Sequence, residues 1–417
     1  MCDNFDNIRV NSEWCFKNVR SVERWTHGYH RYPAKFLPNL VEKLINEKTQ
    51  KGDTIADLFA GCGTTLVEAK IQGRKSIGID INPVAKLITK VKVNPIEPKK
   101  LEKQYSKFIE TIKNYKKSSS YNKDFHERID YWFESENKKK IAFLHKEILK
   151  EKNSKIRSFF LVSLSHILKN CSRWLQSSTK PQIDPNKKIQ EPFKLFKKHT
   201  ERMLKKNGEF YEKLNNEKNL KIECKIKKGD ARNTKIEKNT INAVITSPPY
   251  VTSYEYADIH QLTGYWYEYM NNLPKFRKKF IGTFYSLNKK TNCNSNMAQK
   301  VIDKLLKKDD KMAKEVANYF NDMELVAKEM YRIVKKNGIV CIVIGNTTLK
   351  EVKIKSAEIF FGMLKSVGFE EERIIKRSIP YKLMPTIRDK NSGKFTKLNN
   401  ENHKLVYPEE YILILRK

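Results

Sequence analysis

The tetrapeptide Ser-Pro-Pro-Tyr at residues 247–250 carries the strongest chemical signal in the sequence. It directly follows the apolar run 243–246, and a short apolar run that ends in a turn is typical of a buried strand. Consecutive prolines fix φ and remove backbone N–H donors, so the turn offers a hydroxyl, carbonyl oxygens and an aromatic ring. These groups could accept hydrogen bonds from an amine and stack on a flat ring. The alternative is a purely structural proline turn.

A small-residue loop around Gly61 and Gly63 is the second candidate site. The segment Asp57-Leu58-Phe59-Ala60-Gly61-Cys62-Gly63-Thr64-Thr65 lies between a predicted strand and a predicted helix, where small residues let the backbone approach a ligand. Neither the third glycine of the dinucleotide fingerprint nor the P-loop lysine is present. Asp80 ends the next strand, about 20 residues on, in position to bind ribose hydroxyls. An ordinary strand-to-helix turn with a capping aspartate is the alternative.

The elements that must position these motifs alternate between strand and helix patterns, which predicts an α/β domain with a mostly parallel twisted sheet. Ligands bind at the carboxyl ends of such strands, and both motifs follow a predicted strand. Strands are expected at about 54–59, 76–80, 221–227, 241–246, 339–344 and 411–416, and helices at about 35–47, 64–72, 83–91, 321–336 and 356–367.

Two lysine-rich stretches, at about 96–218 and 265–318, interrupt this alternation and are interpreted as insertions. The chain therefore divides into an N-terminal part of the catalytic domain (1–95), a helical basic insertion (96–218) and the remainder of the domain (219–417). Within the first insertion, Ile141, Leu144, Ile148 and Leu149 have helical spacing in the run 140–173. The insertion is either a helical subdomain with a solvated basic face or a nucleic-acid clamp.

The charge balance favours a polyanionic partner. The 417 residues include 83 Lys and Arg against 48 Asp and Glu, a formal net charge of +35. With 39% hydrophobic and 11% aromatic residues, the chain can form a globular core, which argues against disorder. Nucleic acid is the commonest partner of such a positive field and an anionic membrane surface a rarer one. A lysine-rich composition imposed by an AT-rich genome is the alternative explanation.

The remaining composition argues against metal and membrane roles. The seven cysteines are scattered with no C-x-x-C pair, so neither a zinc ribbon nor a disulfide framework is expected. The strongest apolar run, 339–344, is far too short to span a bilayer. We therefore expect no metal, no membrane and a cytoplasmic location.

Taken together, the F-x-G-x-G loop and the later Ser-Pro-Pro-Tyr turn resemble the S-adenosylmethionine-dependent amino-methyltransferases of DNA. The resemblance covers the sheet-forming parts, and it implies a Rossmann-like methyltransferase fold with helical insertions. It also implies S-adenosylmethionine as methyl donor, with Asp80 on the ribose, Asp230 on the adenine amine and the segment from His30 to Phe36 closing over the methionine end. The implied cofactor residues are Tyr32, Pro33, Lys35, Phe36, Asp57, Phe59, Ala60, Gly61, Gly63, Thr64, Thr65, Asp80, Ile81, Asp230 and Ala231.

The same resemblance assigns catalysis to Ser247, Pro248, Pro249 and Tyr250. The Ser247 hydroxyl and Pro248 carbonyl would accept the two N–H bonds of the target amine, and Tyr250 would stack on a flipped base. No covalent enzyme intermediate is expected, since the chain has no Pro-Cys dipeptide. The segment 253–261 could line the base pocket or could simply pack on the sheet.

A serine before the two prolines resembles the cytosine-N4 enzymes, whereas the adenine-N6 enzymes mostly carry Asp or Asn there. The predicted function is thus a cytosine-N4 DNA methyltransferase of a restriction–modification system, acting on double-stranded DNA near the nucleoid, with a cognate restriction endonuclease as a possible partner. An adenine-N6 enzyme, an RNA N-methyltransferase and a non-catalytic nucleic-acid-binding protein are the alternatives. Either insertion, 96–218 or 265–318, could read the DNA sequence.

Overall fold

A seven-stranded sheet forms the centre of the molecule, in a computed structural model of the chain. The strand order is β3-β2-β1-β4-β5-β11-β8. The first five strands run parallel, and β11 is antiparallel to both of its neighbours. The described residues are 5–17, 23–116, 125–251, 255–283, 285, 291–379, 387–389, 399–405 and 409–417.

The strands of this sheet alternate with helices along the chain, as the sequence predicts. The strands are β1 (Thr54–Asp57), β2 (Lys75–Asp80), β3 (Cys224–Lys228), β4 (Ile241–Thr246), β5 (Val334–Ile344), β8 (Glu370–Ser378) and β11 (Glu409–Arg416). The remaining strands form two small antiparallel pairs, β6 (Thr347–Leu349) with β7 (Val352–Ile354), and β9 (Ile387–Asp389) with β10 (His403–Leu405). The α/β fold class with a mostly parallel sheet is confirmed.

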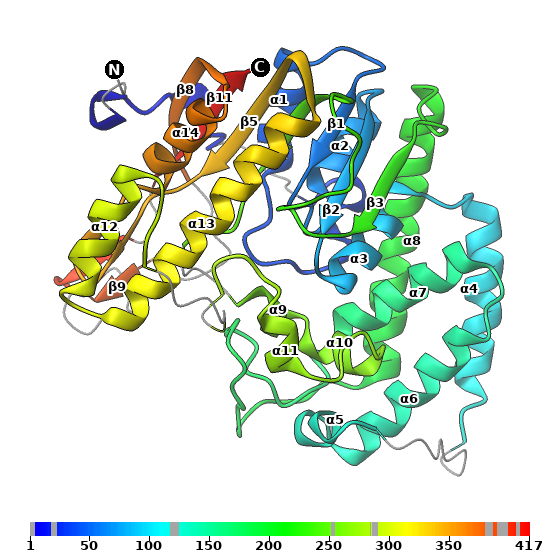
Figure 1. The fold of residues 1–417 in the computed structure, drawn as a ribbon. Helices are drawn as coiled ribbons and strands as arrows, with labels where there is room; N and C mark the ends of the chain where they lie inside the picture. Colours follow the sequence, from blue (N-terminus) through cyan, green and yellow to red (C-terminus); the bar gives the residue numbers. More distant parts are fainter. Residues whose placement is uncertain are drawn as a thin grey trace.

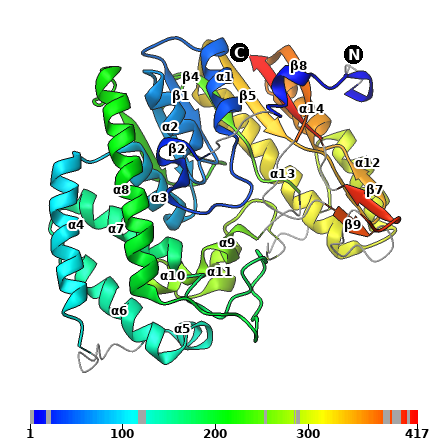
Figure 2. The ribbon, with the colours of Figure 1, turned by 180° about the vertical axis from the view of Figure 1, so that it is seen from behind.

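Helices cover both faces of the sheet (Figures 1 and 2). Helices α13 (Asp310–Ile333) and α14 (Ser356–Ser366) pack on one face, with α12 (Asn296–Leu306) beside α13. Helices α1 (Pro38–Lys48) and α2 (Thr64–Ile71) pack on the other. Successive side chains of β5 point to opposite faces of the sheet. Ile342 therefore packs against the α13–α14 layer, and Val343 packs against the α1–α2 layer.

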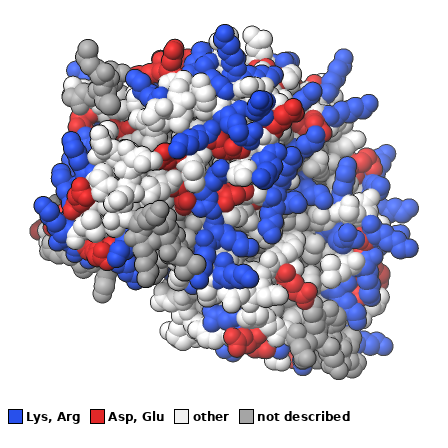
Figure 3. Space-filling view, in the orientation of Figure 1, with Lys and Arg blue, Asp and Glu red and all other residues white. Residues whose placement is uncertain are grey.

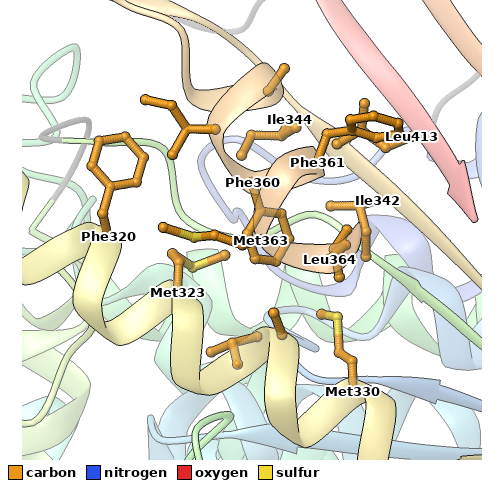
Figure 4. Packing of buried hydrophobic residues seen from close by; sticks show 14 of the residues in the cluster. Phe320, Met323, Met330, Ile342, Ile344, Phe360, Phe361, Met363, Leu364 and Leu413 are labelled. Atoms are coloured by element: carbon orange, nitrogen blue, oxygen red, sulfur yellow. The ribbon is translucent and has the colours of Figure 1, made fainter. Parts of the chain in front are cut away.

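The largest core lies between the sheet and the α13–α14 layer. Figure 4 shows Met323 of α13 beside Phe360 and Met363 of α14, with Met330 of α13 pointing toward Leu364. All of these side chains are at most 3% exposed. Because burying an apolar side chain of this size contributes about 1.5–3 kcal/mol, this layer stabilises the half of the sheet that contains β5 and β11.

A helical part follows α3 (Pro83–Val93) and occupies the other end of the molecule (Figure 1). Helices α4, α6, α7 and α8 pack around aromatic side chains that include Phe108, Phe160 and Phe196. The helices are α4 (Pro98–Lys113), α5 (Glu127–Trp132), α6 (Ser135–Leu149), α7 (Ser154–Ile167) and α8 (Pro192–Asn216). Three short helices, α9 (Tyr256–Ile259), α10 (Gln261–Trp266) and α11 (Leu273–Arg277), connect this part to the sheet.

Three details differ from the sequence-based prediction. The run 140–173 is two helices, because Asn153 caps α7 by accepting hydrogen bonds from the backbone N–H groups of Lys155 and Ile156. Leu149, expected on the buried face, is 48% exposed. The stretch 265–318 was interpreted wholly as an insertion, yet α13 begins inside it at Asp310 and packs on the sheet through Ala313, Val316 and Ala317.

In the described residues, no helix is long and apolar enough to cross a membrane.

Candidate functional site

One large cleft lies at the carboxyl ends of the parallel strands, with a volume of about 1940 Å³. A pocket for a single small ligand is usually about 300–1,000 Å³, so this cleft has room for a cofactor and a second flat group. Fifteen of the nineteen predicted site residues line it: Tyr32, Lys35, Phe36, Asp57, Phe59, Ala60, Gly61, Thr64, Asp80, Ile81, Asp230, Ala231, Ser247, Pro249 and Tyr250.

The other four predicted residues, Pro33, Gly63, Thr65 and Pro248, are not part of the cleft lining. Thr65 is fully buried, with its hydroxyl toward the Ile245 carbonyl. Gly63 forms the N-terminal cap of α2 with a left-handed φ of +78°. Thr65 and Gly63 therefore support the conformation of the glycine loop without lining the cleft.

The glycine loop keeps open the space that a ligand needs. Gly61 has a φ of +48°, and a Cβ placed on it would lie 3.3 Å from the Tyr32 ring. Its backbone N–H donates to the Asp80 carboxylate over 2.8 Å, and its carbonyl accepts from the Thr89 hydroxyl over 3.0 Å. A side chain at Gly61 would fill the narrow gap beside Tyr32, so the loop fits a closely bound cofactor.

Asp80 ends β2 with its carboxylate in the cleft. It accepts hydrogen bonds from the backbone N–H groups of Gly61 and Asn82, each over 2.8 Å. Burial raises its pKa to about 6, although the two backbone hydrogen bonds favour the ionised form. Because a carboxylate offers about four lone-pair positions, Asp80 retains acceptor capacity for hydroxyls of a ligand.

Asp57, at the end of β1, is 3% exposed and mainly orders the loop. Its carboxylate accepts hydrogen bonds from the Thr246 hydroxyl over 2.5 Å and from the Phe59 backbone N–H over 3.1 Å. Burial raises its pKa. Asp57 thus ties the glycine loop to the end of β4, directly before Ser247.

The Ser247 hydroxyl has a defined orientation. It donates its proton to the backbone carbonyl of Val343 over 2.9 Å, and Ser247 lines the cleft. An O–H group has one proton and two lone pairs, so this hydroxyl can act only as an acceptor toward a ligand. The neighbouring Pro249 carbonyl accepts from the Tyr319 hydroxyl over 2.9 Å, whereas the Pro248 carbonyl accepts no hydrogen bond from the described residues.

Tyr250 is held by a buried ion pair. Its hydroxyl donates to Glu410 over 2.7 Å, and Glu410 accepts from Arg377 over 2.5 Å. Arg377 is 2% exposed and Glu410 8%. The ring also lies against Gly345, where a Cβ would come within 2.8 Å of it. This support fixes the Tyr250 ring as one wall of the cleft.

The upstream segment and Asp230 differ from their expected settings. Tyr32, Lys35 and Phe36 lie in the turn before α1 rather than within a helix, because α1 begins at Pro38. Asp230 forms an ion pair with Arg232, whose guanidinium donates to both carboxylate oxygens. An adenine amine at Asp230 would therefore share an acceptor that already binds Arg232.

Several residues that line the cleft were not identified from the sequence. They come from the loop 175–182 of the helical part, from Lys279–Thr283 and from Asn346–Leu349 after β5. Within the segment 253–261, the residues that line the cleft are Glu255, Tyr256, Asp258 and Ile259, whereas 253 and 254 lie outside the described residues. Asn82 also lines the cleft, and it could have been identified from the sequence because an asparagine before a proline marks a helix start. Its side chain caps α3.

Gly63→Ala should destabilise the protein by about 1–3 kcal/mol, because alanine is strained at a left-handed φ and overpacking adds to the cost. The new Cβ would lie 2.6 Å from the Thr89 side chain, which binds the Gly61 carbonyl. Urea unfolding measures the change. Gly208→Ala is the matched control. Gly208 lies inside α8, and a Cβ placed on it would have no atom within 4 Å, so this substitution should stabilise the protein. A Gly63 variant as stable as the wild type would contradict this account.

No group of three or more His, Cys, Asp or Glu side chains suited to a metal ion occurs among the residues that the structure describes.

Comparison with known proteins places the glycine loop and the Ser-Pro-Pro-Tyr turn in a defined family. The family model described as DNA methylase matches residues 3–91 and 241–417. The type II methyltransferase M.MvaI of Kocuria varians is 29% identical over 438 residues, covering 96% of this chain and 93% of that protein. The type II methyltransferase M.BsoBI of Geobacillus stearothermophilus is 31% identical over 272 residues, covering 57% and 51%. A TehB-like SAM-dependent methyltransferase structure from Corynebacterium glutamicum is 8% identical with a TM-score of 0.29, covering 90% of this chain and 86% of that one.

Proposed function

We propose a reaction for this chain, which belongs to the DNA methylase family: transfer of a methyl group from S-adenosylmethionine to the exocyclic N4 amine of cytosine in duplex DNA. Family membership makes the protein a DNA methyltransferase and S-adenosylmethionine its methyl donor. The choice of base and the role of each residue are the proposal.

The orientation of the Ser247 hydroxyl supports the reaction type, and the choice of cytosine rests on the presence of a serine before the two prolines. The exocyclic amine of cytosine is conjugated with its ring and is a poor nucleophile, so its two N–H bonds must be held by acceptors while its lone pair faces the methyl group. Ser247 donates its own proton to Val343, which leaves its lone pairs for one N–H. We assign the other N–H to the Pro248 carbonyl, which accepts no hydrogen bond from the described residues, although Pro248 does not line the cleft in this structure.

The methyl donor supplies an electrophilic methyl group when it is bound. Asp80 would hold its ribose hydroxyls, and the Gly61 loop would surround its methionine end against Tyr32. The amine lone pair would take the methyl group, the electrons of the broken C–S bond would stay on sulfur, and the proton lost from nitrogen would go to water. Ser247 and Pro248 need only orient the amine, so no covalent enzyme intermediate is required.

The target base must leave the helix for this geometry, because its amine is stacked and paired in duplex DNA. The Tyr250 ring, fixed by Glu410 and Gly345, would stack on the flipped base. The cleft volume of about 1940 Å³ is large enough for both the base and the cofactor.

Nucleoside mass spectrometry tests the proposal on unmethylated DNA incubated with the purified protein and S-adenosylmethionine, with RNA as a parallel substrate. We expect N4-methylcytosine in the DNA. N6-methyladenine would overturn the choice of base that rests on Ser247 while leaving the reaction type intact. Methylation of RNA alone would overturn the DNA substrate.

The relatives above are named type II methyltransferases, so we also propose that a restriction endonuclease recognises the same DNA sequence and that the protein acts at the nucleoid. DNA modified by this protein should then resist that nuclease.

Binding of S-adenosylhomocysteine, the demethylated product, should weaken as the pH falls through about 6. The raised pKa of Asp80 means that its carboxylate becomes protonated over this interval and loses acceptor capacity. At pH 5 the affinity should be about tenfold below its value at neutral pH, as measured by calorimetry. Asp80 alone would not destabilise the fold here, since a folded-state pKa above the unfolded value makes its contribution to stability more favourable as the pH falls. A flat affinity between pH 5 and 7 would contradict this role.

A further inference from the structure

A polar hairpin of the helical part forms one wall of the catalytic cleft. It lies between α7 and α8, and its two arms meet in an antiparallel bridge between Trp174 and Ile183. The Leu175 backbone N–H donates to the Gln182 carbonyl over 2.8 Å. Leu175 and residues 177–182 line the same cleft as Ser247 and Tyr250. This segment, the 174–183 hairpin, is thus the part of the insertion that lines the catalytic cleft.

The hairpin is anchored on a buried aromatic pair. Trp174 is 2% exposed and stacks on Trp132, with ring centroids 5.2 Å apart. Its indole N–H donates to the Lys180 carbonyl over 2.9 Å, across the loop. The hairpin is therefore fixed to the core of the helical part through its base and through its tip.

Two lysine side chains hold the backbone of the hairpin in its conformation. The Lys169 ammonium donates to the carbonyls of Gln176 and Ser178, over 3.1 and 2.6 Å. The Lys187 ammonium donates to the carbonyls of Lys169 and Trp174, each over 2.6 Å. Because these bonds use backbone oxygens, they hold the loop conformation without using the side chains at its tip. A loop ordered in advance loses less conformational entropy when it binds.

Several polar side chains of the hairpin are free to recognise a partner. Those of Gln176, Ser177, Thr179, Lys180 and Gln182 make no hydrogen bond or ion pair within the described parts of the chain. Amides, hydroxyls and an ammonium are the groups that read base edges, and the DNA major groove admits a two-stranded ribbon. By contrast, the cleft wall at Phe280 and Ile281 is apolar.

We propose that the 174–183 hairpin enters a groove of the duplex beside the flipped base and reads base edges with Gln176 and Gln182, while Lys180 contacts a phosphate. This inference rests on the proposed function and assigns sequence reading to the first of the two insertions. The surrounding surface suits a polyanion, since Lys and Arg gather over the helical side of the face in Figure 3.

The test uses the full-length protein and unmethylated bacteriophage DNA, with modified sites identified by sequencing. The variants are the Gln176→Ala/Gln182→Ala pair and Lys180→Ala alone. The glutamine pair should reduce the preference for the wild-type target over singly mismatched sites by about tenfold or more. Lys180→Ala should leave that preference unchanged. It should lower by about one the number of counterions released on DNA binding, as read from the slope of log affinity against log salt concentration.

Lys103→Ala/Gln104→Ala on α4, outside the cleft lining, is the matched control and should change neither quantity. Melting temperature and S-adenosylhomocysteine affinity should match the wild type in every variant, because the hairpin scaffold and the cofactor loop are untouched. Unchanged target preference in the glutamine variant, with wild-type methylation intact, would overturn the hairpin assignment alone. Absence of DNA methylation by the wild-type protein would instead overturn the proposed function.

Discussion

Ser247→Ala should lower the rate of methyl transfer about 100-fold, the size of effect expected for losing one preorganised hydrogen bond at a reacting centre. The Ser247 hydroxyl donates to the Val343 carbonyl over 2.9 Å, so in the proposed reaction its lone pairs orient the amine. Alanine removes that acceptor without adding bulk. Single-turnover rates at saturating DNA and S-adenosylmethionine measure the chemical step directly.

Ser366→Ala provides a matched control for this variant. The Ser366 hydroxyl also donates to a backbone carbonyl, that of Met363, over 2.8 Å, but it lies at the end of α14, outside the cleft lining. This control should retain the wild-type rate, and both variants should bind S-adenosylhomocysteine normally. A Ser247 variant whose rate stays within about threefold of the wild type would remove Ser247 from the reacting centre.

Asp80→Asn should weaken S-adenosylhomocysteine binding by about 2 kcal/mol, roughly thirtyfold, because hydrogen bonds to a charged group contribute more than neutral ones. The carboxylate already accepts from Gly61 and Asn82, and asparagine has one acceptor oxygen where the carboxylate has two. The loop would thus compete with the ribose for the remaining oxygen. The variant should also lose the change in affinity near pH 6.

Asp303→Asn, at an exposed carboxylate of α12, is the control and should bind S-adenosylhomocysteine as the wild type does. DNA binding in the absence of cofactor should be unchanged in both variants, since the proposal places Asp80 on the cofactor and not on the nucleic acid. Wild-type affinity in Asp80→Asn would show that the ribose is held elsewhere.

The sequence alone predicted most of the sheet, because apolar strands and periodic helices are encoded by contiguous residues. The runs predicted at 54–59 and 241–246 correspond to the strands β1, which ends at Asp57, and β4. Strand β8 was missed because Glu370–Ser378 is largely charged and exposed, with Ile375 and Arg377 its buried residues. As the last strand of the sheet, β8 pairs along its length with β11, and its other side meets the N-terminal segment at the isolated bridge between Val10 and Lys376. A strand at this position needs little apolar surface, and charged side chains are common on such edges.

The division between α6 and α7 was missed for a different reason. Helical spacing of apolar residues continues across 140–173, whereas the break depends on capping by Asn153. An asparagine cap is a local signal, but here the apolar spacing on both sides of Asn153 is continuous enough to mask the break.

Residue types also identified the candidate site, since the chemistry of Ser247, the Gly61 loop and Asp80 is local to each motif. Their proximity comes from the parallel sheet, which brings the ends of β1, β2 and β4 to one edge. The partners of these residues were invisible in the sequence. Glu410 reaches Tyr250 from 160 residues away, and the 174–183 hairpin reaches the cleft only because the helical part packs beside the sheet.

The clearest case is the Val343 carbonyl, which lies 96 residues beyond Ser247. A backbone oxygen carries no side-chain signature, so no pattern could reveal it. Register decides the contact: Thr246 of β4 pairs with Ile342 of β5, which sets Ser247 level with Val343. The sequence by itself therefore determined which chemical groups are present, and the tertiary structure decided which way the serine proton points, because hydrogen-bond direction depends on partners that only strand pairing brings together.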